Sequence, residues 1–192
     1  PTRRSSDLDF LVPAGGHHHL YEAPHLGQTW HSDGLSGSGY DVTELQCFYY
    51  PQAVEIEDGP TMILPGSHCR AVDREAIAHY GDIMGQVSLT VPAGTVAMTR
   101  YGLWHKAGPK TNDRRRGMLK FSYHRQVAPQ RDWRIETDEI PAYSDRPRLA
   151  YVTEVESYRD RVRRMHTWNW LCGQDTDVAL RWARSRPVSE VL

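Results

Sequence analysis

Short extended runs alternate with turn residues through the middle of this chain, and this rhythm is the main structural signal in its pattern of hydrophobic and polar positions. Residues 43–50 are rich in strand formers and stop at Pro51. Residues 57–60 have the composition of a turn, and the apolar run at residues 61–64 ends at a proline and a glycine. Short strands separated by frequent turns predict a β-sandwich or a β-barrel.

The next segment continues this pattern with one helix inserted. Residues 73–80 predict a short helix, with Asp73 as its N-cap or first-turn acid. Residues 86–91 and 95–99 predict two further strands, and the Pro-Ala-Gly sequence at 92–94 predicts a hairpin-like turn between them.

Residues 116–125 predict the last strand of the core. Alternation places Arg116, Met118 and Lys120 on one face of this strand and Leu119 on the other. If Arg116 points into the barrel, Lys120 does too, and a buried lysine is costly unless it is paired. Two alternatives stay open: a bulge turns Lys120 out to solvent, or its ammonium group meets an anionic group of a substrate.

The ends of the chain differ from this core. Residues 151–165 and 175–184 predict helices. We therefore interpret residues 9–130 as the β-rich core and residues 131–192 as a mostly helical extension packed on the same domain. Residues 1–8 read like the in-frame translation of a sequencing adapter, so we expect them to be a non-native leader.

Composition narrows the class of protein. The chain has 192 residues, 39% of them hydrophobic and 24% charged, which is typical of a globular domain. A net charge of −1 offers no basic surface for nucleic acid or for an anionic membrane. The apolar runs are too short to span a bilayer, and the three cysteines show no C-x-x-C spacing. We expect a cytoplasmic protein with reduced thiols; the oligomeric state stays open.

The candidate chemistry begins at His31 and Asp33. Side chains two residues apart in an extended segment project to the same side, so both can reach one metal ion. An H-x-D tripeptide alone is a weak signal, but a second histidine brought in by the fold would complete a two-histidine, one-carboxylate face, and His105 is the candidate. That face leaves coordination positions open on iron(II) and is typical of non-haem oxygenases. Arg116, eleven residues after His105, could clamp the far carboxylate of 2-oxoglutarate through a bidentate pair.

The His-His-His run at residues 17–19 gives a weaker signal. It has no spacing typical of metal ligands, so we interpret it as a polar loop or the edge of a sheet.

Three motifs in this order resemble the phytanoyl-CoA dioxygenase family, over about residues 28–123. They are the H-x-D, the sequence Gly-Pro-Thr-Met-Ile-Leu-Pro-Gly-Ser-His at 59–68, and the distal His105 followed by Arg116. The resemblance implies a mainly β fold, a double-stranded β-helix (a cupin-like jelly roll) with flanking α-helices. It also implies that His31, Asp33 and His105 bind Fe(II) and that Arg116 anchors 2-oxoglutarate.

Further site residues follow from the same resemblance. Tyr49 occupies a position where the family often places an aromatic side chain beside the co-substrate. Many members carry a serine two residues after the distal histidine, whereas this chain has Ala107. Two alternatives follow: a lower affinity for 2-oxoglutarate, or a hydroxyl group supplied by Thr99 or Tyr123 instead. His68 corresponds to a structural position and not to a ligand.

The implied function is a dioxygenase that uses Fe(II), 2-oxoglutarate and O2 to hydroxylate a small molecule, with release of succinate and CO2. Halogenating relatives lack the carboxylate found here at Asp33, which favours hydroxylation. Lys120 and Gln28 are expected to contact the substrate. Two alternatives remain: a cupin-like metal-dependent isomerase or lyase, and an inactive, truncated relative that binds a small molecule. Because family members usually carry a longer segment before the H-x-D, we expect this chain to lack an N-terminal part.

Overall fold

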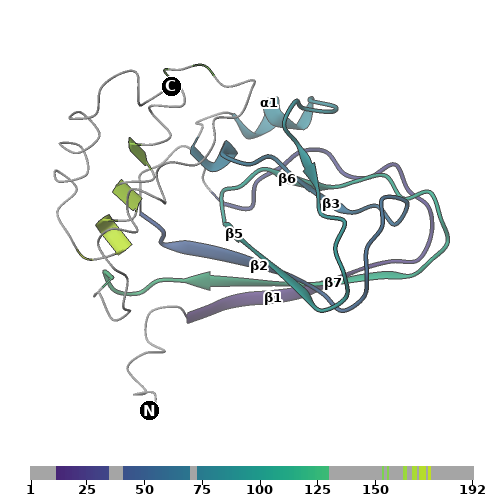
Figure 1. Cartoon of the computed structure of the whole chain (residues 1–192), viewed down its shortest axis with the longest axis horizontal. Helices are drawn as coiled ribbons and strands as arrows, with labels where there is room; N and C mark the ends of the chain where they lie inside the picture. Colours follow the sequence, from purple (N-terminus) through teal and green to yellow (C-terminus); the bar gives the residue numbers. More distant parts are fainter. Residues whose placement is uncertain are drawn as a thin grey trace, which may run out of the picture. The chain divides into compact units, whose positions relative to one another are not determined.

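The computed structural model describes residues 12–34, 41–69 and 73–129, together with scattered positions between 153 and 173 (Figure 1). The chain divides into two compact units. One contains the described residues 12–34 and 43–124, and the other contains residues 41–42 and the described positions from 125 onward.

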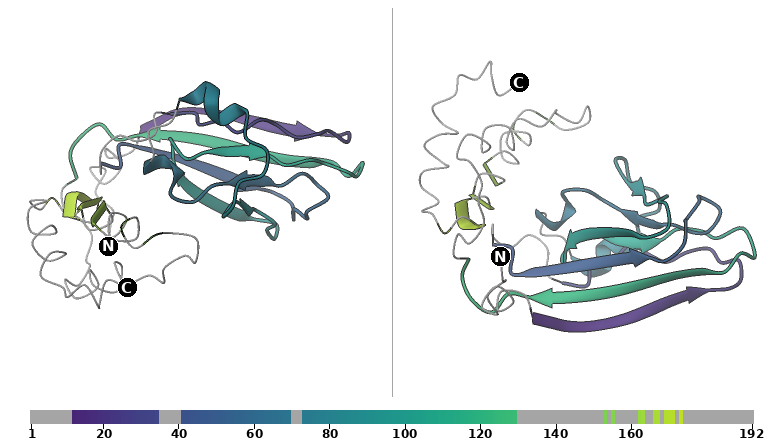
Figure 2. Two further views of the ribbon diagram at one scale, coloured as in Figure 1. Left: turned by 90° about the horizontal axis from the view of Figure 1, so that it is seen from above. Right: turned by 60° about the horizontal axis from the view of Figure 1, so that its bottom comes forward.

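A four-stranded antiparallel sheet forms the larger layer of the first unit. Its strands lie in the order β1 (Val12–Tyr21), β7 (Arg116–His124), β2 (Glu44–Tyr50) and β5 (Thr95–Arg100). Figure 2 shows the long strands β1, β7 and β2 side by side. The His-His-His run lies in β1, an edge strand of this sheet, as predicted.

A three-stranded antiparallel sheet forms the second layer. Its strands lie in the order β4 (Val87–Ser88), β3 (Thr61–Ile63) and β6 (His105–Ala107). Side chains of the two sheets meet: the Thr61 hydroxyl lies 3.8 Å from the Met118 sulfur, and the Phe48 and His105 rings are 5.4 Å apart between centroids. Two facing antiparallel sheets of short strands are the arrangement of a jelly roll, so the fold is the mainly β double-stranded β-helix that was predicted.

The hairpin expected around residues 92–94 is wrong. β4 and β5 belong to different sheets. Val91 exchanges backbone hydrogen bonds with Val54 at 2.9 and 3.0 Å, and the Gly94 amide donates to the Tyr50 carbonyl at 2.8 Å. Gly94 has a φ of +83°, which favours glycine. The turn residues reverse the chain as expected, but they carry it from one sheet to the other.

Alternation along the central strands separates a buried face from a more exposed one. On β2 the buried residues are Gln46, Phe48 and Tyr50. On β7 the inward positions carry Arg116 and Lys120, as the sequence predicted. The pairing of β7 is irregular only opposite residues 13–15 of β1, so the bulge considered for Lys120 does not occur.

Two clusters of buried side chains form the core. One contains Trp30, Met62, Ile77 and Trp104, and the other contains Phe48, Tyr50, Val54 and Met118. Burying an aliphatic or aromatic side chain of this size contributes about 1.5–3 kcal/mol relative to exposure. The first cluster includes Trp30 and Trp104, the residues immediately before His31 and His105, so it fixes the backbone from which those two imidazoles project.

The predicted short helix is confirmed as α1 (Arg74–Ala78). The Asp73 carboxylate accepts a hydrogen bond from the Glu75 amide at 3.0 Å, which makes Asp73 its N-cap. A 3-10 turn, η2 (Ser67–Cys69), precedes it.

The second unit is described at few positions. Residues 155, 162–163, 166–167 and 169–171 are helical, partly within the helix predicted at 151–165. The Arg125 guanidinium lies 5.5 Å from the centre of the Trp170 ring. The helix predicted at 175–184 and the leader predicted at 1–8 lie outside the described residues, and the packing of residues 131–192 stays a prediction.

Two further expectations concern thiols and membranes. Cys47 is a free thiol, and Cys172 lies outside the described residues. Among the helices that the structure describes, none is long and apolar enough to cross a membrane.

Candidate metal centre

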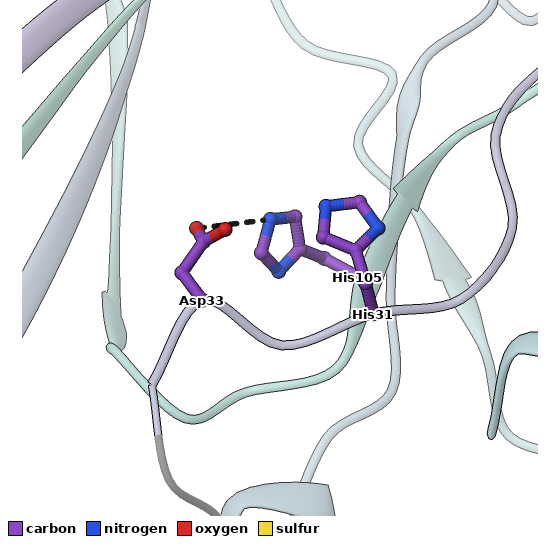
Figure 3. A group of neighbouring side chains, drawn as sticks. All are labelled: His31, Asp33 and His105. Atoms are coloured by element: carbon purple, nitrogen blue, oxygen red, sulfur yellow. Dashed lines mark ion pairs between the residues drawn. The ribbon is translucent and has the colours of Figure 1, made fainter. Parts of the chain in front are cut away.

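His31, Asp33 and His105 converge, as the sequence predicted. Their ligand atoms all lie within 4.8 Å of one another, and Figure 3 shows the three side chains grouped beside β6. The backbones of His31 and His105 are joined by two hydrogen bonds of 3.1 and 2.9 Å, so the two imidazoles come from adjacent segments. Asp33 follows His31 by two residues, where the chain bends, and its carboxylate reaches the same point.

The Pro-Gly-Ser sequence after β3 holds the backbone that precedes His105. The Ser67 hydroxyl accepts a hydrogen bond from the Trp104 amide at 2.9 Å, and the Leu64 amide donates to the Trp104 carbonyl at 3.0 Å. The motif at residues 59–68 therefore has a structural role, which is to hold the segment that carries His105. His68 is part of the same 3-10 turn, and it belongs neither to the three-residue group nor to the lining of the cavity described below.

Both histidines present the same ring nitrogen for coordination. Nδ1 of His105 lies 3.0 Å from the Leu103 carbonyl oxygen, and Nδ1 of His31 lies 2.9 Å from the Thr29 carbonyl oxygen. A carbonyl oxygen only accepts, so each Nδ1 carries a proton, and in the neutral form of either ring Nε2 is the nitrogen with a free lone pair. Burial lowers the pKa of His105 to about 4, which keeps its imidazole neutral at neutral pH. Neutral imidazole is the form that binds a metal ion.

Two side chains donate hydrogen bonds to Asp33, and a third lies close to it. Lys120 Nζ and Gln46 Nε2 both donate to its Oδ2 atom, and His105 Nε2 lies 3.4 Å from the same oxygen. Burial alone would raise the pKa of this carboxyl group. The hydrogen bond and charge of Lys120, the hydrogen bond from Gln46 and the charge that His105 carries at low pH lower this pKa overall. Asp33 is therefore an anion at neutral pH. Gln46, fully buried on the inward face of β2, was not singled out from the sequence.

The bulge that would turn Lys120 out to solvent does not occur, and in the structure its ammonium group pairs with an acid of the protein itself. The Lys120 side chain is buried, its ammonium group pairs with Asp33, and Nζ lies 3.4 Å from His105 Nε2. The Phe48 ring lies 5.6 Å away and adds a weaker cation–π contact. The expected inward direction is confirmed, and the partner within the protein is a candidate metal ligand.

Arg116 is almost completely buried, with 1% of its surface exposed. Its Nη2 donates to the Thr61 hydroxyl at 2.9 Å, and the guanidinium carbon lies 5.3 Å from the centre of the Tyr21 ring. Among the described residues, Nε and Nη1 find no hydrogen-bond acceptor. Burial lowers the pKa of Arg116 but leaves it cationic, since an arginine side chain stays protonated in proteins. A buried guanidinium with two unused donors fits a site for a carboxylate.

The hydroxyl group beside Arg116 comes from Thr61, and the expectation of Thr99 or Tyr123 is wrong. Thr99 pairs with Gln46 in the β2–β5 ladder and does not line the cavity. Tyr123 is an odd-numbered residue of β7 and lies on the face opposite Arg116.

The aromatic contact expected from Tyr49 is also wrong by one residue. Tyr49 alternates to the more exposed face of β2, whereas its neighbours Phe48 and Tyr50 are buried on the inner face. Phe48 lines the cavity, and Tyr50 lies close enough to Arg116 to raise the pKa of its guanidinium group.

A cavity of about 120 Å³ joins these groups. His31, Asp33, His105, Arg116 and Lys120 all line it, and so does Gln28, whose Oε1 accepts a hydrogen bond from the Ala107 amide at 3.2 Å. Its wall also includes three side chains of β1: His17, His19 and Tyr21. Sequence reasoning placed the histidine run on a sheet edge but missed that alternate members of it face the cavity.

The residues present fit iron and 2-oxoglutarate. Two imidazoles and one carboxylate form the facial ligand set of non-haem Fe(II) enzymes. A guanidinium with free donors in the same cavity matches a dicarboxylate co-substrate.

Solved structures of other proteins share this fold. The non-heme monooxygenase ThoJ aligns with a TM-score of 0.51 at 19% identity, over 64% of this chain and 51% of that one. AviO1 from Streptomyces viridochromogenes Tue57 aligns with a TM-score of 0.51 at 22% identity, over 62% and 53%. This chain therefore spans about half the length of the proteins it resembles. At these identities the likeness shows the fold alone. Among curated proteins, no sequence matches this chain.

The sequence model of phytanoyl-CoA dioxygenase matches residues 12–118, more than half of the chain. The matched region contains β1, the three converging side chains and Arg116. The predicted resemblance is thus confirmed: this chain belongs to the phytanoyl-CoA dioxygenase family.

Proposed function

We propose that this protein is a dioxygenase that uses Fe(II), 2-oxoglutarate and O2 to hydroxylate a small molecule. The observation that carries the proposal is the convergence of His31, Asp33 and His105 in one cavity with the unsatisfied guanidinium of Arg116. The metal ligands and the co-substrate anchor would then share a single site. The same pairing of groups argues against an isomerase or lyase of the cupin type, because such chemistry has no need for a dicarboxylate anchor.

The protein's own residues would bind and orient the reactants. His31 and His105 would offer their Nε2 lone pairs, and Asp33 its carboxylate. Gln46 would hold that carboxylate in place, which is the usual task of groups behind a metal ligand. When bound, Fe(II) and 2-oxoglutarate supply the activation of O2 and the oxidation of a C–H bond, and the co-substrate leaves as succinate and CO2.

Arg116 and Thr61 would position the far carboxylate of 2-oxoglutarate. The guanidinium keeps two donors for it, and the Thr61 hydroxyl fixes the third nitrogen. Thr61 thus fills the place of the serine that Ala107 replaces in this chain.

Lys120 and Gln28 are the residues proposed to contact the substrate. Both line the cavity. The carbonyl oxygen of the Gln28 side chain is already used by the Ala107 amide, so its amide nitrogen is left to donate to a bound molecule.

Hydroxylation is proposed over halogenation because Asp33 supplies a carboxylate at the position that halogenating relatives leave open for a halide. Mass spectrometry of the product formed in chloride buffer tests this assignment. A hydroxylated product is expected, and a dominant chlorinated product would overturn it.

Succinate released from 2-oxoglutarate tests the proposal as a whole. We expect release only when Fe(II) is present, and none from Asp33→Ala; His68→Ala should behave like the unmodified protein because His68 lies outside the site. Turnover of a substrate without succinate would favour an isomerase or lyase, and binding without any turnover would favour an inactive relative.

A further inference from the structure

Neighbouring strands β1 and β7 form one wall of the cavity, and several basic side chains lie along it. In the antiparallel register His17 lies opposite Lys120, His19 opposite Met118 and Tyr21 opposite Arg116. All six side chains line the cavity. Directly opposed residues of neighbouring strands have Cβ atoms about 4.5–5.5 Å apart, so the His17 imidazole is an immediate neighbour of the Lys120 side chain.

The two cationic side chains on this wall, Arg116 and Lys120, lie too far apart to bind the same carboxylate. Arg116 and Lys120 are four residues apart on β7, so their attachment points lie about 13 Å apart along the strand. One carboxylate at Arg116 therefore does not satisfy Lys120 as well. Among the residues that line the cavity, Asp33 is the only acid.

Asp33 is also the carboxylate ligand of the candidate metal centre, so a bound divalent cation would coordinate it. The Lys120 ammonium donates to Asp33 Oδ2 and lies 3.4 Å from His105 Nε2, so it sits among the ligand atoms of the candidate metal centre. A metal ion bound there would compete with the ammonium group for the same oxygen. Lys120 is only 5% exposed, and a buried ammonium group without an anion is costly.

We propose that Lys120, with His17 and His19, forms a subsite that binds an anionic group, a carboxylate or a phosphate, of the small-molecule substrate. The inference rests on the proposed function, because it treats the second occupant of the cavity as a substrate. Lys120 supplies the charge, and the two imidazoles supply hydrogen-bond donors from the opposite strand. His17 is exposed and His19 half-buried, so this end of the cavity opens to solvent, where a substrate can enter.

The register provides a matched control within the same tripeptide. His18 lies between the two histidines in sequence but alternates to the other face of β1, and it does not line the cavity. Loss of His18 removes the same type of side chain from the same strand without touching the subsite.

The decisive experiment needs neither metal nor co-substrate. Asp33→Asn keeps the shape of the side chain, so Gln46 keeps its partner, but it removes the acid that pairs with Lys120 among the described residues. We expect calorimetry to show inorganic phosphate binding to metal-free Asp33→Asn at least about tenfold more tightly than to the unmodified protein, since one charge-assisted pair is worth about this factor or more. The double variant Asp33→Asn, Lys120→Met should lose the gain. Phosphate binding unchanged by Asp33→Asn, in protein with native circular dichroism, would overturn the subsite.

Two further binding measurements identify the residues of the subsite and show whether its anion belongs to the substrate or to the co-substrate. In the Asp33→Asn background, His17→Ala should weaken phosphate binding several-fold, and His18→Ala should leave it unchanged; equal effects would overturn the role of His17.

In nickel-loaded protein, Lys120→Met should leave the affinity for 2-oxoglutarate within about threefold. A tenfold loss there would mean that Lys120 serves the co-substrate, and the assignment to the substrate would fail.

These outcomes separate the subsite from the proposed function. A gain in phosphate binding without iron-dependent succinate release would leave an anion subsite in a protein of another activity. Succinate release without that gain would leave the dioxygenase and remove the subsite.

Discussion

The two ends of the cavity are built from similar groups but differ in how completely the protein satisfies them. At one end, the Asp33 carboxylate receives hydrogen bonds from Lys120 and Gln46, so its charge is balanced within the chain. At the other end, Arg116 is even more deeply buried, yet only its Nη2 finds an acceptor among the described residues. A buried charge persists only where something compensates it. The Arg116 end is therefore organised for a ligand, whereas the Asp33 end carries its own cation.

The largest expected effect comes from breaking the Asp33 end. His105→Ala removes one of two imidazole ligands. Loss of a group that merely hydrogen-bonds to a metal ligand already costs about ten- to a hundredfold in metal affinity. We expect affinity for Fe(II) or Ni(II) to fall by at least about a hundredfold, measured by calorimetry. His68→Ala is the control and should bind metal normally. Undiminished metal binding by His105→Ala would show that another histidine is the second ligand.

The second effect tests the Arg116 end. Arg116→Gln removes the charge expected to hold the far carboxylate, and a charge-assisted hydrogen bond is worth about 1.5–3 kcal/mol, which corresponds to about ten- to a hundredfold in affinity. Calorimetry on nickel-loaded protein should show this loss for 2-oxoglutarate, with metal binding unchanged.

Arg115→Gln is its matched control. Arg115 immediately precedes β7, is exposed and pairs with Glu22 at 3.3 Å. If Arg115→Gln weakened 2-oxoglutarate binding as much as Arg116→Gln, the assignment of the anchor would be wrong.

The third effect sharpens the contrast between the ends. Lys120→Met removes the cation that shares Asp33 with the metal, and two unit charges about 4 Å apart interact by about 4 kcal/mol at an effective dielectric constant of about 20. After partial screening we expect metal affinity to rise by roughly tenfold. Lys106→Met is the control, since Lys106 pairs with Asp82 and lies over Trp30 instead. A lower metal affinity in Lys120→Met would mean that Lys120 supports the metal centre and does not compete with it.

The smallest effect concerns the loop that leads into the Arg116 strand. Asp58 is buried and accepts hydrogen bonds from Arg114, from the Asn112 side chain and from the Glu55 amide, so its pKa lies well below the usual value. Because the folded pKa is depressed, this stabilisation is present above the unfolded pKa of about 3.9 and is lost as the pH falls below it. Asp58→Asn should lower the melting temperature at pH 7, and the difference should shrink toward pH 3. A difference that does not change with pH would contradict this role.

Much of the fold and of the metal centre could be predicted from local pattern. Alternation along 116–125 placed Arg116 and Lys120 on the inner face, because a strand has a fixed period of two. The same period failed at residues 48–50, where three consecutive aromatic side chains give no indication of which face is buried. The structure shows that Tyr49 is the outer one.

Other features depend on contacts between distant segments. Lys120 and Asp33 are 87 positions apart, and nothing in either neighbourhood marks them as partners. Thr61 reaches Arg116 from the other sheet, across 55 positions. The His17 and His19 side chains could have been found, since their spacing of two in an extended run already places both on one face. What the sequence did not show was that this face turns inward.

The most direct test of the account is anaerobic calorimetry of 2-oxoglutarate with Fe(II)-loaded protein. The account predicts that one equivalent binds when iron is present, that binding is much weaker without metal, and that Arg116→Gln weakens it by at least about tenfold. Binding that is as tight without iron as with it, and that is indifferent to Arg116, would contradict a shared site for metal and co-substrate.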